Sequence, residues 1–67
     1  MTKAQFIKKM RARGFKPDAL GYWVCPDPLS GLHIYPANAG ESYSAQLAYM
    51  IKEYRKHCAQ NNLEPIW

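Results

Sequence analysis

The chain has 67 residues, 48% of them hydrophobic, and its nine Lys and Arg residues exceed its five Asp and Glu residues, giving a formal net charge of +4. A chain of this length has room for one domain with one core, and its hydrophobic content excludes a compositionally disordered protein. It contains neither an apolar run long enough to cross a bilayer nor a signal-peptide pattern. We therefore expect a single domain over residues 1–67, located in the cytoplasm.

The first predicted element is a helix at about residues 3–13. Thr2 is a suitable N-cap, and Gly14 supplies the left-handed residue that commonly ends a helix, with Phe15 placed to fold back on it. Three apolar residues fall on one face at helical spacing: Phe6, Ile7 and Met10. The pattern predicts an amphipathic helix with that face in the core.

Two short strands follow, at about residues 22–25 and 32–35, after a turn that opens at Pro17 and Asp18. The six residues 26–31 contain two prolines and a glycine and are expected to form the loop of a β-hairpin. We find no candidate for a third strand. The sequence thus predicts a two-stranded antiparallel ribbon.

The alternation of side chains along a strand assigns the faces of this ribbon in part. Leu32 and Ile34 are the better core residues, which leaves His33 and Tyr35 on the other face. From the first strand, either the pair Trp23 and Cys25 or the pair Tyr22 and Val24 joins the core, and both alternatives stay open.

A second helix is predicted at about residues 43–60, capped by Ser42 or Ser44. Its apolar stripe has the spacing of a buried helix face and consists of Tyr43, Leu47, Met50, Ile51, Tyr54 and Cys58. The apolar tail 63–67 should fold back onto the body. The expected fold is α+β, helix–β-hairpin–helix (α-β-β-α), with two helices packed on one face of the ribbon.

The sequence carries no catalytic or metal-binding motif. Neighbours on a helix point about 100° apart, so His57 and Cys58 cannot form a dyad by themselves. Cys25 and Cys58 lack the spacing of a metal site and are expected to be reduced and packed. We therefore expect a protein that is not an enzyme, with no cofactor, no metal and no small-molecule substrate.

Cations are concentrated near the start of the chain, where no acidic residue precedes Asp18. They form a candidate phosphate-binding surface, to which the second helix adds two more. The members are Lys8, Lys9, Arg11, Arg13, Lys16, Arg55 and Lys56, with Lys3 also in the basic stretch. Such a surface would suit a nucleic acid, although a solvated helix face has the same appearance.

Aromatic residues indicate a second kind of surface. Two Phe, five Tyr and two Trp are too many for so small a core, so part of the ribbon should stay open. The expected partner-binding residues are Tyr22, Trp23, His33 and Tyr35. Tyr and Trp dominate the energetics of protein interfaces. We therefore expect an inhibitor or adaptor of bacterial or phage accessory type that grips a protein partner or self-associates, with nucleic-acid binding as the alternative and no membrane partner.

The order of helix, Gly14-Phe15, ribbon, Pro36 and helix resembles that of HicA-type toxins, which have a double-stranded-RNA-binding-like fold. The resemblance covers most of the chain and implies a catalytic His in a Gly-Ser-His-like segment on the first hairpin. Here the nearest segment, Gly31-Leu32-His33, lies in another strand and lacks the Ser, and the family's third strand has no counterpart. The resemblance therefore does not carry ribonuclease activity to this chain.

Overall fold

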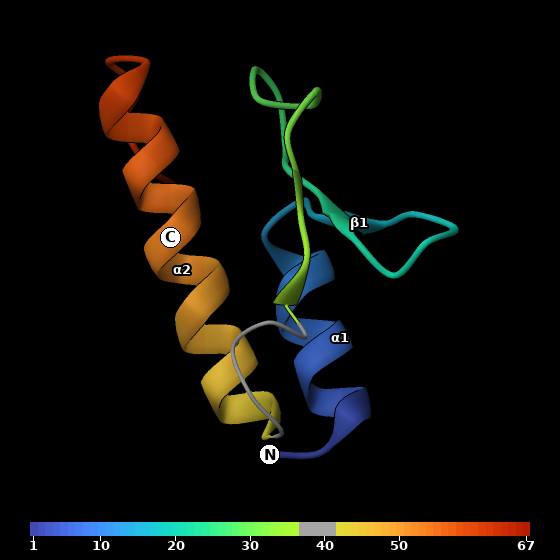
Figure 1. The fold of residues 1–67 in the computed structure, drawn as a ribbon. Coiled ribbons are helices and arrows are strands. Elements are labelled where there is room, and N and C mark those ends of the chain that lie inside the picture. Colours follow the sequence, from blue (N-terminus) through green and yellow to red (C-terminus); the bar gives the residue numbers. More distant parts are fainter. Residues whose placement is uncertain (37–41) are drawn as a thin grey trace.

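The computed structural model describes residues 1–36 and 42–67 and shows two helices with a small sheet (Figure 1). The elements follow in the order α1 (Lys3–Ala12), β1 (Lys16–Pro17), β2 (Trp23–Val24), β3 (His33–Ile34) and α2 (Tyr43–Gln60). The fold is α+β, as predicted. The two helices pack against each other and begin at the same end of the molecule (Figure 1).

The sheet has three antiparallel strands in the order β1-β2-β3, so the prediction of a two-stranded ribbon was wrong. Lys16 pairs with Val24 and Pro17 with Trp23, which places the missed strand before the predicted hairpin. Proline is tolerated in β1 because β1 is an edge strand, where a missing N–H need not break a ladder. The third strand whose absence distinguished the sequence from HicA-type proteins is therefore present.

The two predicted strands are present but shorter, with Trp23 paired to Ile34 and Val24 to His33. Trp23, Cys25 and Ile34 are buried, whereas Val24 is half-buried. Of the two alternatives for β2, the structure thus has Trp23 and Cys25 facing inward. Paired residues share a face of the sheet, so Lys16, Val24 and His33 form a row on the outer face.

Local hydrogen bonds fix both ends of α1. Thr2 and Gln5 form a reciprocal capping box, with the Gln5 N–H donating to Thr2 Oγ1 at 3.2 Å. The helix ends one residue earlier than predicted, and Gly14 follows with φ of 86°. The Phe15 N–H donates to the carbonyl of Met10 at 3.2 Å, which completes a Schellman motif. This turn directs the Phe15 side chain into the core.

Helix α2 has the predicted bounds and ends in the same type of motif. Ser42 is the cap, and its Oγ accepts a hydrogen bond from the Ala45 N–H at 3.0 Å. Asn62 takes the left-handed position with φ of 55°, and the Leu63 N–H donates to the Cys58 carbonyl at 2.9 Å. The chain therefore turns back after Leu63 and runs alongside α2 (Figure 1).

One hydrophobic cluster joins the inner face of the sheet to both helices. Its buried members are Phe6, Met10, Phe15, Trp23, Cys25, Ile34, Met50, Tyr54 and Cys58. The ring of Phe15 lies 5.3 Å from that of Tyr54 and 5.5 Å from that of Trp67, so the tail closes one side of the core. The predicted return of the tail is confirmed. Among the described residues, no helix combines the length and the apolar character needed to cross a bilayer.

The turn at Gly14 gives a first prediction. A Cβ at this position would lie 3.1 Å from Cβ of Pro26, in a backbone conformation that L side chains rarely adopt. We expect Gly14→Ala to lower the free energy of unfolding by about 1–2 kcal/mol, and the melting temperature by at least about 4 °C, measured by circular dichroism.

Gly31→Ala is the matched control, because a Cβ at Gly31 would meet no atom within 4 Å and the backbone there is not left-handed. Its melting temperature should equal that of the wild type. Equal melting temperatures for all three proteins would contradict the assigned role of Gly14.

Candidate functional site

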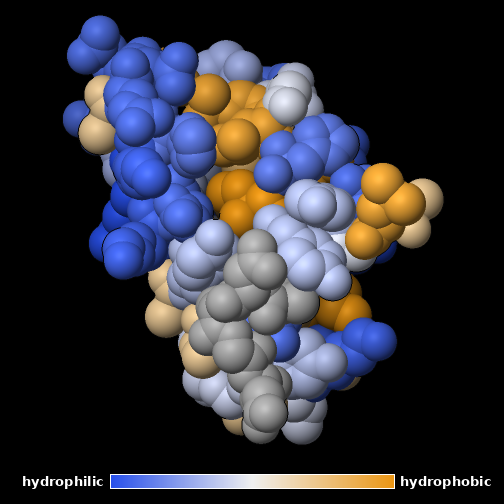
Figure 2. All heavy atoms as spheres, viewed as in Figure 1, coloured by the Kyte–Doolittle hydropathy of each residue, from blue (hydrophilic) through white to orange (hydrophobic). Residues whose placement is uncertain are grey.

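The outer face of the sheet carries exposed apolar and aromatic side chains. The rings of Tyr22 and Tyr35 stack with centroids 4.8 Å apart, and the two residues are 38% and 37% exposed. Leu20, at the tip of the β1–β2 connection, is 79% exposed. Figure 2 shows this tip as an apolar projection at the right of the molecule. With His33, these residues make up what we call the outer aromatic surface.

The carboxylate of Asp18 organises this surface. Its Oδ1 accepts hydrogen bonds from the N–H groups of Leu20 at 2.8 Å and Tyr22 at 3.0 Å. Its Oδ2 lies 2.8 Å from Nδ1 of His33 on β3. The hydrogen bond with His33 is the main reason why the pKa of Asp18 lies below its usual value, and the two backbone N–H groups act in the same direction. One side chain thus fixes both the loop and its distance from β3.

The structure brings three of the four predicted partner-binding residues together. Tyr22, His33 and Tyr35 are exposed on the outer face, but Trp23 is only 6% exposed and faces the core, where its ring meets Phe6 edge-on at 5.9 Å. The expectation of an exposed Trp23 was therefore wrong, because consecutive strand residues point to opposite faces. Sequence reasoning missed Leu20, since exposure of a loop residue leaves no periodic signal.

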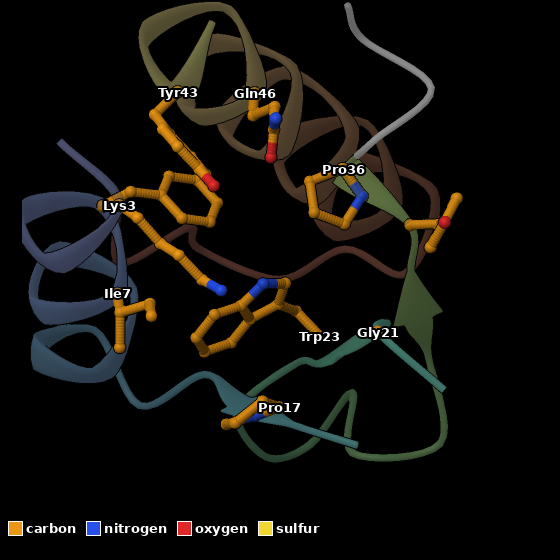
Figure 3. Close-up of a pocket in the computed structure, with 10 residues that line it drawn as sticks. Lys3, Ile7, Pro17, Gly21, Trp23, Pro36, Tyr43 and Gln46 are labelled. Atoms are coloured by element: carbon orange, nitrogen blue, oxygen red, sulfur yellow. The ribbon is translucent and has the colours of Figure 1, made fainter. Parts of the chain in front are cut away.

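A pocket of about 370 Å³ opens beside the outer aromatic surface, between α1, the sheet and the first turn of α2 (Figure 3). We call it the Trp23 pocket, because the indole of Trp23 forms its floor. Its lining residues are Lys3, Phe6, Ile7, Pro17, Gly21, Trp23, Tyr35, Pro36, Tyr43 and Gln46. Apolar and aromatic groups predominate, and no acidic residue is among them.

Polar groups from three elements point into the Trp23 pocket. Figure 3 shows the ammonium group of Lys3 and the side-chain ends of Tyr43 and Gln46 directed toward its centre. The indole nitrogen of Trp23 also faces this space (Figure 3). The pocket could not be predicted from the sequence, because its walls come from segments that are distant along the chain.

The predicted phosphate-binding residues fall into two groups, those that contact the tail and those that lie free of it on the surface. The guanidinium of Arg13 donates to the Ile66 carbonyl at 2.9 Å and lies 5.5 Å from the Trp67 ring. Arg55 donates to the Trp67 carbonyl at 2.6 Å. Both are predicted phosphate contacts, and in the structure both are exposed and bind the returning tail.

The remaining cations lie on the surface. Lys56 is 3.8 Å from a Glu53 carboxylate oxygen, so its charge is partly offset. The exposed cations that form no hydrogen bond or ion pair with another described residue include Lys8, Lys9, Arg11 and Lys16. Three of the seven predicted residues, Lys56 and the two arginines, therefore already have a partner within the protein.

The thiols are enclosed in the core. Cys25 and Cys58 are both unpaired and buried, as predicted. Burial raises the pKa of Cys25 to about 11, and the neighbouring Cys58 adds to the effect. A thiol in this environment is a weak nucleophile at neutral pH. Among the described residues, no group of three His, Cys, Asp or Glu side chains is arranged to hold a metal ion.

The lowered pKa of Asp18 predicts how stability depends on pH. Because the folded-state pKa lies below the unfolded value of about 3.9, the ionised carboxylate stabilises the fold above that pH, and this contribution is lost as the pH falls through the folded-state pKa. We expect Asp18→Ala to melt below the wild type at pH 6, and the difference to shrink as the pH falls below about 4.

Asp27→Ala is the matched control, because Asp27 is exposed and forms no hydrogen bond with a described residue. Its melting temperature should follow that of the wild type over the same pH range. A difference between Asp18→Ala and the wild type that stays constant down to the lowest pH would contradict the assignment.

The buried thiols give a further prediction. A pKa of about 11 in place of 9.0 lowers the thiolate fraction of Cys25 on the order of a hundredfold, and burial also blocks access. We expect an aromatic disulfide reagent at pH 7.4 to label the native protein at least a hundredfold more slowly than the protein in guanidinium chloride. Equal rates would show that the core does not enclose the thiols.

Comparison of the chain with models of protein families, with curated proteins and with solved structures gives no match. The chemistry and geometry of the residues on the outer face and in the Trp23 pocket therefore carry the functional interpretation.

Proposed function

We propose that this protein is a non-enzymatic binding protein that holds a protein partner through its outer aromatic surface. The stacked and exposed pair of Tyr22 and Tyr35, with the projecting Leu20, is the observation that carries the proposal. A module of this size would act as an inhibitor or adaptor, of the accessory type found in bacteria and their phages, by covering a functional surface of its partner.

The chemistry of these side chains suits a protein interface. Tyrosine offers a large contact area with only two rotatable side-chain bonds, so ordering it on binding costs little conformational entropy. Stacking between Tyr22 and Tyr35 restricts both rings before any partner arrives. Such preorganisation favours affinity because less freedom is lost on association.

The hydrogen bonds of Asp18 support the same reading. They hold the connection that carries Leu20 and Tyr22 in one conformation and tie it to His33 on β3. A single exposed leucine is normal on a protein surface, but Leu20 at 79% exposure adds to the exposed Tyr22 and Tyr35, and a larger apolar surface of this kind marks an interaction site. A rigid loop that presents an apolar tip is well suited to enter a hollow on a partner.

The charge of the molecule favours an acidic partner. Lys16 lies in the same row as His33 across the outer face, and the net charge of the chain is +4. Cations at the rim of an apolar surface speed the encounter with a partner of opposite charge. Binding to nucleic acid is less well supported, because Arg13 and Arg55 hold the tail.

Capture of partners from a nuclease-treated lysate of the source cell tests the proposal. We expect Leu20→Ser and Tyr22→Ala each to reduce recovery of a specific protein by about tenfold or more, since hot-spot residues of an interface contribute about 2 kcal/mol or more each. Both side chains are exposed, so circular dichroism should show unchanged folding.

The double variant Lys8→Gln/Arg11→Gln is the control, because it removes charge from α1 and leaves the outer aromatic surface intact. It should capture the same protein to within about threefold, as expected for charges away from the contact. Loss of capture in this variant, with full capture by Leu20→Ser, would place the contact on α1 and contradict the proposal. A dimer in sedimentation that Tyr22→Ala dissociates would identify a second copy as the partner.

A further inference from the structure

We infer that the Trp23 pocket is an anchor site for an acidic segment of a protein partner, which inserts one aromatic side chain and places a neighbouring carboxylate against Lys3. This inference rests on the proposed function and adds to it the chemistry of the partner. It draws on the size of the pocket, on its donors and charge, and on its continuity with the outer aromatic surface.

The size and walls of the pocket fit a single large side chain. Its volume of about 370 Å³ is at the lower end of the range of roughly 300–1,000 Å³ for ligand sites. Aromatic rings from four segments line it: Phe6 from α1, Trp23 from β2, Tyr35 after β3 and Tyr43 from α2. Aromatic rings pack on one another in stacked or edge-on geometry with a gain beyond area alone. An inserted ring is therefore a better occupant than an aliphatic chain.

The floor of the pocket has an unused hydrogen-bond donor. Trp23 is 94% buried, and its indole N–H, which can only donate, makes no hydrogen bond to another described residue. Figure 3 shows this nitrogen facing the pocket, beside the ammonium of Lys3. No buried side-chain nitrogen or oxygen among the described residues lacks a hydrogen-bond partner, so this N–H is open to solvent within the pocket. A ligand acceptor, such as a peptide carbonyl or a carboxylate oxygen, can take up this donor in place of water.

The electrostatics of the pocket favour an anion. Among the described residues, Lys3 is the one cation that lines it, and none of them contributes a carboxylate. Both helices begin at the same end of the molecule (Figure 1). Lys3 and Tyr43, the first residues of α1 and α2, line the pocket, so the positive ends of two helix dipoles lie near it. A carboxylate next to the inserted ring would meet Lys3 and remain exposed to water at the rim.

The position of the pocket indicates a polypeptide. Gly21 and Tyr35 line it, while Leu20 and Tyr22, on either side of Gly21, belong to the outer aromatic surface. A chain that crosses this surface therefore reaches the pocket within a few residues. A nucleic-acid strand would need a track of cations leading into the site. Lys8, the next lysine of α1, lies about 140° around the helix from Lys3 and is not part of the lining.

Nuclear magnetic resonance of the ¹⁵N-labelled protein tests the inference directly. The chain has two tryptophans, so only two indole N–H signals occur, and that of Trp67 serves as the internal control. The probe is the peptide acetyl-Glu-Glu-Phe-Glu-amide. One control peptide has Ala in place of Phe, and the other has Lys in place of each Glu. We expect the parent peptide alone to shift the Trp23 indole signal with saturation, and the Trp67 signal to stay in place.

Substitutions in α1 then distinguish a specific contact with Lys3 from general electrostatic attraction to the protein. Lys3→Gln should weaken binding of the parent peptide at least fivefold, and Lys8→Gln, with the same loss of charge on another face, less than twofold. No Trp23 shift at millimolar peptide, equal binding of the Lys-containing peptide, or equal effects of the two variants would overturn the inference. A Trp23 shift with oligothymidylate that exceeds the shift with the peptide would overturn it as well.

Failure of this inference can be told apart from failure of the proposed function. The capture experiment depends on Leu20 and Tyr22, neither of which lines the pocket. If those substitutions abolish capture of the partner while Lys3→Gln has no effect on it, the outer aromatic surface is the interface and the pocket is not its anchor site. If Lys3→Gln alone abolishes capture, the pocket binds the partner without that surface.

Discussion

The inward position of Trp23 determines the rest of this structure. Burial of an indole removes on the order of 200 Å² from water, which stabilises a small domain by about 5 kcal/mol, comparable to the total stability expected at this length. Side chains alternate along β2, so an inward Trp23 forces Tyr22 outward. A slip of one residue would reverse both faces. The outer aromatic surface is thus a consequence of the core rather than a separate feature.

Asp18 turns this general arrangement into a defined surface. The core fixes which way Tyr22 points, but a loop of five residues between β1 and β2 has many conformations. The carboxylate removes most of them by accepting two backbone N–H groups within the loop. Its contact with His33 then sets the loop relative to β3, where Tyr35 stacks on Tyr22. Local and long-range order in this region therefore depend on the same side chain.

The elements that could be predicted from sequence are those encoded by neighbouring residues. Helix α2 has the predicted bounds because its apolar stripe, its Ser42 cap and its C-terminal turn all act within a few residues. Strand β1 escaped prediction because Pro17 indicates a turn, and only pairing with β2 makes it a strand. The face of β2 also depended on packing. In the candidate site, the outward positions of His33 and Tyr35 followed from alternation. The outward face of Tyr22, the Trp23 pocket and the engagement of Arg13 by the tail depend instead on residues far apart in the chain.

The distribution of charge follows from the same contacts. Trp67 lies against Phe15, and the backbone carbonyls of the tail accept hydrogen bonds from Arg13 and Arg55. These two cations therefore stabilise the side of the core that the tail covers, away from the outer face of the sheet. Lys3 and Lys16 remain beside the pocket and the outer aromatic surface, respectively. A positive charge there acts at short range on whatever contacts the rings, whereas Lys8 and Arg11 contribute only to long-range attraction. For the proposed binding function, the few cations near the rings thus matter more than the total charge of the chain.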